Sequence, residues 1–123
     1  MKHLAEAIEF RRVMGQPLNT PDENVHELQF ALIREEFKEL EEAYENEFDQ
    51  EAFPLEEQLK ELTDLVFVAY QYAAARGWDL DTSLTRVFES NMSKLVDGKP
   101  LRREDGKILK GPNYQPPHLT DLL

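Results

Sequence analysis

Apolar side chains recur every three or four residues along most of the first 95 positions of the chain. This is the period of an α-helix with a buried stripe, and it predicts four helices. Their expected ranges are about 2–14, about 22–47, 54–76 and about 79–95. The sequence therefore predicts an all-α fold, a helical bundle with four main helices per chain.

The second and third predicted helices are apolar on two flanks, which is typical of helices at the centre of a bundle. The second carries Phe30, Ile33, Phe37, Leu40 and Tyr44, with Leu28 and Leu32 beside them, and the third carries Leu55, Leu59, Leu62, Val66, Ala69 and Ala73, with Leu65, Val68 and Tyr72 beside them. The first helix is too short to cover both. We therefore expect oligomerisation, as a homodimer or homotetramer, to cover the remaining apolar faces.

Capping and breaking residues agree with these helix limits. Glycine and proline end helices, whereas Asp and Asn side chains cap their first turns. The stretch NEFDQEAFP breaks the second helix from the third. The sequence offers Gly15 and Gly77 as stops, Pro54 as a first-turn residue, Asp22 or Asn24 as one cap, and Asp79 or Asp81 as another.

The composition changes near residue 97, where most of the glycines and prolines begin. Two Asp-Gly pairs, at 97–98 and 105–106, predict turns, so residues 97–123 are expected to form an irregular tail. Basic side chains gather in this tail, whereas residues 35–64 are dominated by acids. We interpret residues 1–123 as a single domain, because this length fits one hydrophobic core.

The overall charge excludes some classes of function. The formal net charge is −11, which argues against a general nucleic-acid binder, because such proteins neutralise phosphates with basic residues. The chain has no cysteine, so neither disulfides nor thiolate ligands are available. The first dozen residues contain acids and arginines, which predicts neither a signal peptide nor a membrane span. We expect a cytoplasmic protein.

The strongest chemical pattern is a pair of acidic motifs on the two central helices, Glu36-x-x-Glu39 and Glu61-x-x-Asp64. Side chains three residues apart lie on one helix face and can converge on one point. Four converging carboxylates repel one another unless cations neutralise them, and oxygen ligands select Mg²⁺, with Mn²⁺ as a substitute. Glu35 lies close to Glu39 around the helix, so Glu35 and Glu36 are candidate catalytic residues.

Other readings of the same residues are weaker. A lone Glu-x-x-Glu is common on solvated helices, but both motifs here flank apolar stripes, where a purely solvating charge would be costly. A di-iron bundle needs two Glu-x-x-His motifs, and only Glu23-x-x-His26 occurs. His3 and His118 are expected on the surface. Neither a phosphate-binding P-loop nor a nucleophile elbow is present.

Two segments, LIREEFKELEEA and QLKELTDLVFVAYQYAAARGWDLDTSL, resemble the MazG-like all-α nucleoside triphosphate pyrophosphohydrolases. The tail VFESNMSKLVDGKPLRREDGKILKGPNYQPPHL resembles the phosphoribosyl-ATP pyrophosphohydrolase-like branch of that superfamily, and EFRRVMGQP resembles members related to dimeric dUTPases. The E-x-x-E and E-x-x-D motifs of the superfamily match Glu36, Glu39, Glu61 and Asp64. The likeness extends over about residues 28–118.

The resemblance implies Mg²⁺-dependent hydrolysis between the α and β phosphates, which yields a nucleoside monophosphate and pyrophosphate. It also implies an oligomer whose four-helix core is assembled between subunits. An Asn and a Lys on the last helix accompany the acidic site in that branch, and they match Asn91 and Lys94. Basic tail residues could neutralise charge on the departing pyrophosphate. Arg103, Lys107 and Lys110 are therefore also phosphate-binding candidates, weaker than Asn91 and Lys94.

Three functions remain open at the level of sequence. The leading one is a nucleoside triphosphate pyrophosphohydrolase that removes dUTP, dCTP or a modified nucleotide from the pool. The second is the phosphoribosyl-ATP pyrophosphohydrolase of histidine biosynthesis. The third is a non-catalytic helical interaction module, which the presence of both acidic motifs disfavours. The sequence does not identify the nucleobase.

Overall fold

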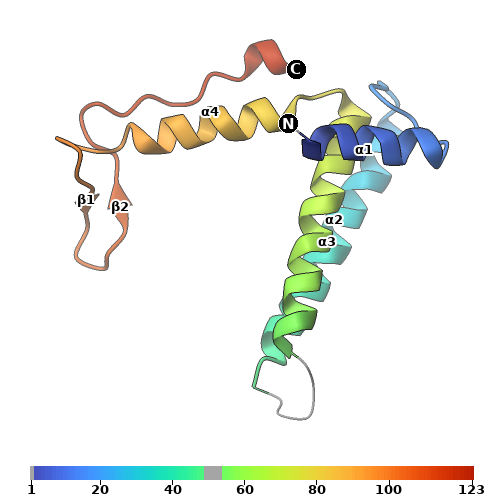
Figure 1. Cartoon of the computed structure of the whole chain (residues 1–123), viewed down its shortest axis with the longest axis horizontal. Coiled ribbons are helices and arrows are strands. Elements are labelled where there is room, and N and C mark those ends of the chain that lie inside the picture. The colour runs from blue at the N-terminus through green and yellow to red at the C-terminus, as the bar shows by residue number, and fades with distance from the viewer. Residues whose placement is uncertain (1, 49–53) are drawn as a thin grey trace. The chain divides into compact units, whose positions relative to one another are not determined.

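The computed structural model describes residues 2–48 and 54–123. These ranges contain four α-helices, which confirms the predicted all-α class (Figure 1). They are α1 (Lys2–Val13), α2 (Glu23–Glu45), α3 (Pro54–Arg76) and α4 (Leu80–Met92). Part of the predicted break at NEFDQEAFP, residues 49–53, lies outside the described residues. Within the described ranges, every helix is too short or too polar to cross a membrane.

The chain divides into two compact units by its internal contacts. The N-terminal unit, residues 1–78, holds α1, α2 and α3. The C-terminal unit, residues 79–123, holds α4, the short strands β1 (Leu101–Arg102) and β2 (Ile108–Leu109), and the single 3₁₀ turn η1 (Thr120–Leu122). That the two units act as one domain stays a prediction.

Helices α2 and α3 run side by side in opposite directions (Figure 1). The Asp22 side chain caps α2 by accepting a hydrogen bond of 2.9 Å from the Asn24 backbone. The loop before α2 also reaches the end of α3, where the backbone N–H groups of Asn19 and Thr20 donate to the carbonyls of Ala74 and Ala75. The start of α2 is therefore fixed against the end of α3, and this sets which residues face each other along the pair.

The end of α3 depends on Gly77. Its φ of 78° is left-handed, and a Cβ there would lie 2.2 Å from the Asn19 side chain, so a larger residue would be strained and would force Asn19 to move. The Trp78 N–H donates to the Ala73 carbonyl, and the Gly77 N–H donates to Ala74. This is the Schellman motif, and it confirms Gly77 as the predicted helix stop.

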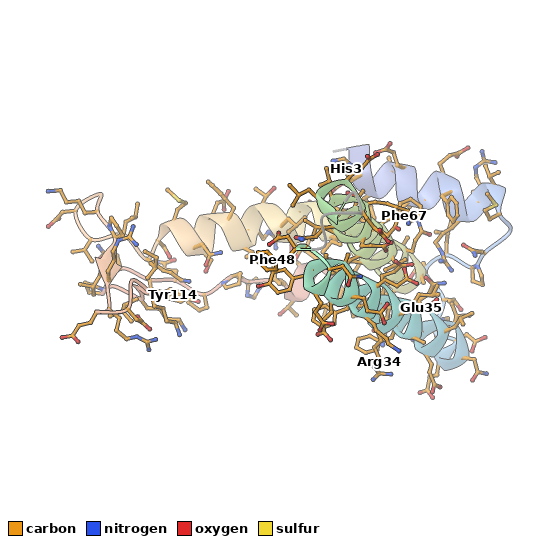
Figure 2. All side chains as sticks on the ribbon, turned by 90° about the horizontal axis from the view of Figure 1, so that it is seen from below. His3, Arg34, Glu35, Phe48, Phe67 and Tyr114 are labelled. Atoms are coloured by element: carbon orange, nitrogen blue, oxygen red, sulfur yellow. The ribbon has the colours of Figure 1, made fainter. Side chains whose placement is uncertain are left out.

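Helix α1 packs against the C-terminal half of α3. The rings of Phe10 and Phe67 meet edge to face at 5.1 Å, near the point where His3 also approaches α3 (Figure 2). Arg11 is almost completely buried, and its guanidinium donates to the Pro17 carbonyl at 2.8 Å and contacts the Gln71 Oε1 at 3.5 Å. Burial lowers the pKa of Arg11.

The buried apolar residues of the N-terminal unit are mostly small. They are Ala7, Ala43, Tyr70, Ala73, Ala74 and Ala75. Large apolar side chains of α2 and α3 stay exposed instead, among them Phe37 at 54%, Leu59 at 64% and Leu62 at 47%. The three helices thus bury little of the apolar surface that the sequence pattern provides.

In the C-terminal unit, Asp79 caps α4 by accepting hydrogen bonds from the Thr82 N–H and hydroxyl. The helix ends at Met92, earlier than the sequence predicts. The Ser93 hydroxyl donates to the Ser90 carbonyl at 2.5 Å, and such local bonds compete with continuation of a helix. The Ser90 hydroxyl donates to the Gln115 carbonyl at 2.7 Å, which ties the tail to α4.

Both predicted Asp-Gly turns are confirmed. Asp97 and Gly98 have φ values of 52° and 74°, and two backbone hydrogen bonds join Val96 and Lys99 across them. The second turn, at residues 105–106, joins β1 to β2. The tail is thus more ordered than predicted, since it forms an antiparallel two-stranded hairpin rather than turns and extended chain alone.

Candidate metal centre

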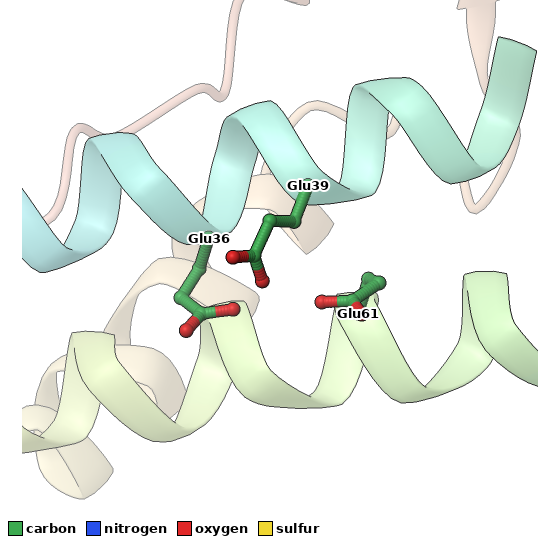
Figure 3. Close-up of side chains that lie close together, drawn as sticks. All are labelled: Glu36, Glu39 and Glu61. Carbon is green, nitrogen blue, oxygen red and sulfur yellow. The ribbon is translucent and has the colours of Figure 1, made fainter.

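Three carboxylates converge between α2 and α3, as Figure 3 shows. Glu36 and Glu39 extend from α2 and Glu61 extends from α3, and each offers an oxygen within 4.8 Å of the others. We call these three residues the glutamate cluster. The i, i+3 spacing places the first two on one face of α2, and the antiparallel pairing of the helices brings the third opposite them.

The oxygens of the glutamate cluster are poorly satisfied by the protein. Glu61 is only 7% exposed, and one oxygen each of Glu36 and Glu61 is buried without a hydrogen-bond partner. Leaving a buried carboxylate oxygen unpaired is costly, and like charges nearby increase that cost. A hard divalent cation such as Mg²⁺ would remove both penalties. The donor set and its burial therefore fit a metal ion.

The electrostatics of the cluster give the same indication. The pKa of Glu39 is raised to about 7, first because of hydrogen bonding to Glu36 and repulsion by its charge, and then because of Glu61 and burial. Without a cation, the folded protein thus favours a proton on this cluster near neutral pH. A proton and a metal ion relieve the same repulsion, so they compete for these oxygens.

The fourth acidic residue of the motif, Asp64, lies outside the group of three. Its side chain is 38% exposed and accepts a hydrogen bond of 2.9 Å from the Lys60 ammonium. Lys60 also contacts Glu61 at 3.3 Å. Both carboxylates raise the pKa of Lys60, Asp64 more strongly. The structure therefore brings together three of the four residues that the sequence assigns to metal, and it pairs the fourth with a lysine.

Glu35, the other catalytic candidate, is exposed on α2 and lies outside the glutamate cluster. Its neighbour Arg34 is also exposed (Figure 2), and the Arg34 guanidinium lies over the ring of Phe30 at 4.7 Å. Glu35 is therefore exposed to solvent, and the structure does not hold it against Glu36, Glu39 or Glu61.

Asn91 and Lys94, the candidates from the last helix, do not both lie on that helix. Asn91 is exposed in the last turn of α4, whereas Lys94 follows the C-cap Ser93. The Lys94 N–H still donates to the Asn91 carbonyl at 3.2 Å, so the turn continues for these residues. They remain neighbours within the C-terminal unit.

The three basic tail candidates differ in their surroundings. The guanidinium of Arg103 makes two hydrogen bonds to the Asp105 carboxylate, which raises the pKa of Arg103. The Lys110 ammonium lies over the Tyr114 ring at 4.7 Å. Lys107 is exposed, and its backbone N–H donates to Asp105. Arg103 is thus already neutralised by a neighbouring acid.

Sequence reasoning did not single out Lys60. Its position was visible, because a lysine four residues before an acid on a helix forms an ion pair, and Lys60 also precedes Glu61 directly. The histidine of the partial di-iron motif has a structural place instead. His26 is buried, and its Nε2 lies 2.7 Å from the Thr20 carbonyl, where it supports the loop before α2.

Comparison with known protein families places the chain among the MazG-like all-α nucleoside triphosphate pyrophosphohydrolases. Within that superfamily, the model of the phosphoribosyl-ATP pyrophosphohydrolase family matches residues 7–91, well over half of the chain, and the protein belongs to this family. No curated protein matches the chain. The protein is therefore a pyrophosphohydrolase, a hydrolase that acts on phosphoric anhydrides and binds a nucleotide substrate.

The matched range contains Glu35, the glutamate cluster and Asp64, and it ends at Asn91. The residues after Asn91 are not covered by the match. Any role of Lys94, Arg103, Lys107 or Lys110 therefore rests on their chemistry and on the resemblance of the tail.

Proposed function

We propose that the protein is a Mg²⁺-dependent nucleoside triphosphate pyrophosphohydrolase. It adds water across the anhydride between the α and β phosphates, which releases a nucleoside monophosphate and pyrophosphate. The observation that carries this proposal is the glutamate cluster, with buried oxygens of Glu36 and Glu61 that have no partner. The family match supports a substrate class for this cluster. A pyrophosphohydrolase acts on a polyphosphate, and a metal ion can neutralise the negative charge of that substrate.

Glu36, Glu39, Glu61 and Asp64 would hold the ion, with Mn²⁺ as a substitute for Mg²⁺. When bound, the ion supplies Lewis-acid chemistry, polarising the phosphates and lowering the pKa of coordinated water. Glu35 or Glu36 would accept the proton of the attacking water. The four carboxylates extend from α2 and α3. Their positions are fixed because the loop before α2 fixes how these two helices pair.

Asn91, Lys94, Arg103, Lys107 and Lys110 are proposed to bind the substrate phosphates. An ammonium or guanidinium there would stabilise the charge that develops on departing pyrophosphate. Lys94 and Lys107 have the clearest chemistry for this, because neither forms an ion pair with another of the described residues. Arg103 would first have to leave Asp105.

The substrate is proposed to be a nucleotide of the cellular pool, such as dUTP, dCTP or a modified nucleotide, hydrolysed in the cytoplasm as a house-cleaning reaction. The family match favours a second candidate, phosphoribosyl-ATP. A panel containing the common nucleoside triphosphates, modified forms and phosphoribosyl-ATP, with Mg²⁺ and with EDTA, distinguishes the two. Pyrophosphate release from a triphosphate at higher kcat/KM than from phosphoribosyl-ATP supports the house-cleaning proposal, and the reverse order supports the second candidate. Pyrophosphate release at the same rate in EDTA as with Mg²⁺ contradicts the metal requirement.

We also propose that the protein is a homodimer or homotetramer in which α2 and α3 complete a four-helix core. Phe37, Leu59 and Leu62 are about half exposed or more on these helices, and burying them against a second chain would remove apolar surface from water. Light scattering at micromolar concentration should give a multiple of the chain mass of 14.4 kDa.

A charged variant tests which face is buried. Leu59→Asp should yield a monomer, whereas Val13→Asp, at a position of similar exposure at the end of α1, should leave the assembly intact. A monomeric wild-type protein refutes the proposed assembly, and an unchanged mass of Leu59→Asp places the interface elsewhere.

A further inference from the structure

Lys60 occupies an unusual place beside the glutamate cluster. Its ammonium lies 2.9 Å from an Asp64 oxygen and 3.3 Å from Glu61 Oε1, so one lysine contacts two of the four carboxylates proposed to hold metal. The other Glu61 oxygen is the buried one without a partner. Glu61 thus lies between two electrostatic environments, with a cation on one side and the carboxylates Glu36 and Glu39 on the other.

The two sides of Glu61 differ in what balances their charge. On the side of Glu36 and Glu39, no basic group among the described residues forms an ion pair with either of these two carboxylates. On the side of Asp64, the Lys60 ammonium contacts one oxygen of Asp64 and one oxygen of Glu61. An ammonium and a divalent ion cannot share this position, because both are cations that need the same lone pairs.

We propose that Lys60 is an internal counter-cation that competes with a divalent ion for Asp64 and Glu61. Lys60 holds Asp64 in the metal-free protein and releases it when the ion binds, so it lowers the affinity of the site for that ion. This inference rests on the proposed metal function of the glutamate cluster. It adds a residue that limits metal loading and keeps Asp64 in place before the ion arrives.

The exposure of the groups allows such an exchange. The Lys60 side chain is 65% exposed, so its stem can swing into solvent without opening the helix pair. A surface hollow of about 460 Å³, bordered by Glu56, Glu57, Lys60 and Glu61, gives an ion and its water access from this side. An exposed ion pair contributes little to stability, so a divalent ion can displace the ammonium.

A matched lysine makes the test specific. Lys38 directly precedes Glu39 on α2, as Lys60 directly precedes Glu61 on α3. Lys38 is exposed and forms no ion pair with the described residues. Lys38→Met therefore removes the same charge from the same acidic surface without touching Asp64, whereas Lys60→Met also frees Asp64. Lys60→Arg keeps the charge.

The experiment is a titration of the nucleotide-free full-length protein with Mn²⁺, followed by electron paramagnetic resonance of the free ion. Lys60→Met should bind Mn²⁺ about twofold to fivefold more tightly than wild type, the range that loss of one competing surface charge provides. Lys38→Met should gain clearly less, and Lys60→Arg should resemble wild type. In an Asp64→Asn background, most of the gain from Lys60→Met should disappear.

Two failures are distinguishable. If wild type binds Mn²⁺ but Lys60→Met gains no more than Lys38→Met, Lys60 acts only as a general surface charge and the inference is overturned. If neither wild type nor any variant binds Mn²⁺, the proposed metal function of the glutamate cluster is wrong. Lys60 then has no bound ion to compete with. Thermal melting of each variant in EDTA checks that the helix pair remains folded.

Discussion

The acidic helix pair of α2 and α3 brings like charges together, whereas the basic tail pairs opposite charges. In α2 and α3, Glu36, Glu39 and Glu61 are held together although they repel one another. In the C-terminal unit, opposite charges are paired, as in the two hydrogen bonds from Arg86 to Asp121 at 2.6 and 2.9 Å. A fold that can pair charges but leaves three carboxylates converging supports the proposal that an external cation binds there.

The same comparison ranks the phosphate-binding candidates. A basic side chain that already has an acidic partner must break that pair before it binds phosphate. The free energy gained from binding phosphate is reduced accordingly. Arg103 is in this position because of Asp105, whereas Lys94 has no such pair among the described residues. We therefore expect unequal effects from substitutions that remove the same charge.

The largest expected effect comes from the acidic residues. Glu36→Gln, Glu39→Gln, Glu61→Gln and Asp64→Asn should each lower Mg²⁺-dependent pyrophosphate release by about a hundredfold or more, because each removes a metal ligand. In EDTA, the three glutamine variants should melt at or above the wild-type temperature, since each relieves repulsion. Undiminished turnover in two of the folded variants contradicts the site assignment.

A smaller effect is expected from Lys94→Ala. If Lys94 contacts the substrate phosphates, the variant should lose roughly tenfold in kcat/KM. Its Mn²⁺ affinity without nucleotide should stay unchanged, because an ammonium cannot coordinate a cation. Steady-state kinetics and a Mn²⁺ titration measure the two quantities. Unchanged kinetics with a lowered melting temperature would leave Lys94 as a residue that stabilises the turn after α4.

The cluster should also make stability depend on pH in the absence of metal. The pKa of Glu39 is about 7 in the folded protein and 4.5 for an ordinary glutamate, so between these values the folded state binds more protons. Its contribution to stability is therefore present in full below pH 4.5 and is lost as the pH rises through 7.

Melting curves in EDTA at pH 5.5 and pH 8 measure this difference. Wild type should melt at a higher temperature at pH 5.5 than at pH 8, and this difference should be smaller in Glu39→Gln, which cannot titrate at this position. Saturating Mg²⁺ should reduce the difference, because the ion replaces the proton. A pH dependence that is identical in wild type and Glu39→Gln would show that the cluster is not under this repulsion.

The smallest effect is expected from Arg103→Ala. Because Asp105 already neutralises the guanidinium, we expect a change in kcat/KM of less than about threefold, well below that of Lys94→Ala. Asp105→Ala should then release Arg103 and lower KM slightly. A loss from Arg103→Ala as large as that from Lys94→Ala would show that the arginine leaves Asp105 in the substrate complex.

The sequence predicted the helices because their information is local. Apolar periodicity, the Asp22 and Asp79 caps and the Gly77 stop all act within a few residues. The helix spacing also predicted that Glu36 and Glu39 would converge. Asp64 contacts Lys60 instead of the glutamate cluster. A motif that is defined by its acidic positions alone does not include the neighbouring lysine, so it did not predict this contact.

The end of α4 and the β1–β2 hairpin were less predictable for a related reason. Ser93 and Ser90 form hydrogen bonds with the backbone, including that of Gln115, more than twenty residues away. Such long-range bonds leave little trace in an apolar pattern. The helix therefore appeared to continue to about residue 95, and the two short strands appeared as irregular chain.

Anomalous diffraction from crystals grown with Mn²⁺ tests the central claim most directly, because it locates the ion without relying on activity. We predict an anomalous peak at the glutamate cluster, with oxygens of Glu36, Glu39 and Glu61 about 2.0–2.2 Å from it. Crystals of a folded protein with Mn²⁺ bound elsewhere, and with these three carboxylates free of metal, would contradict the account.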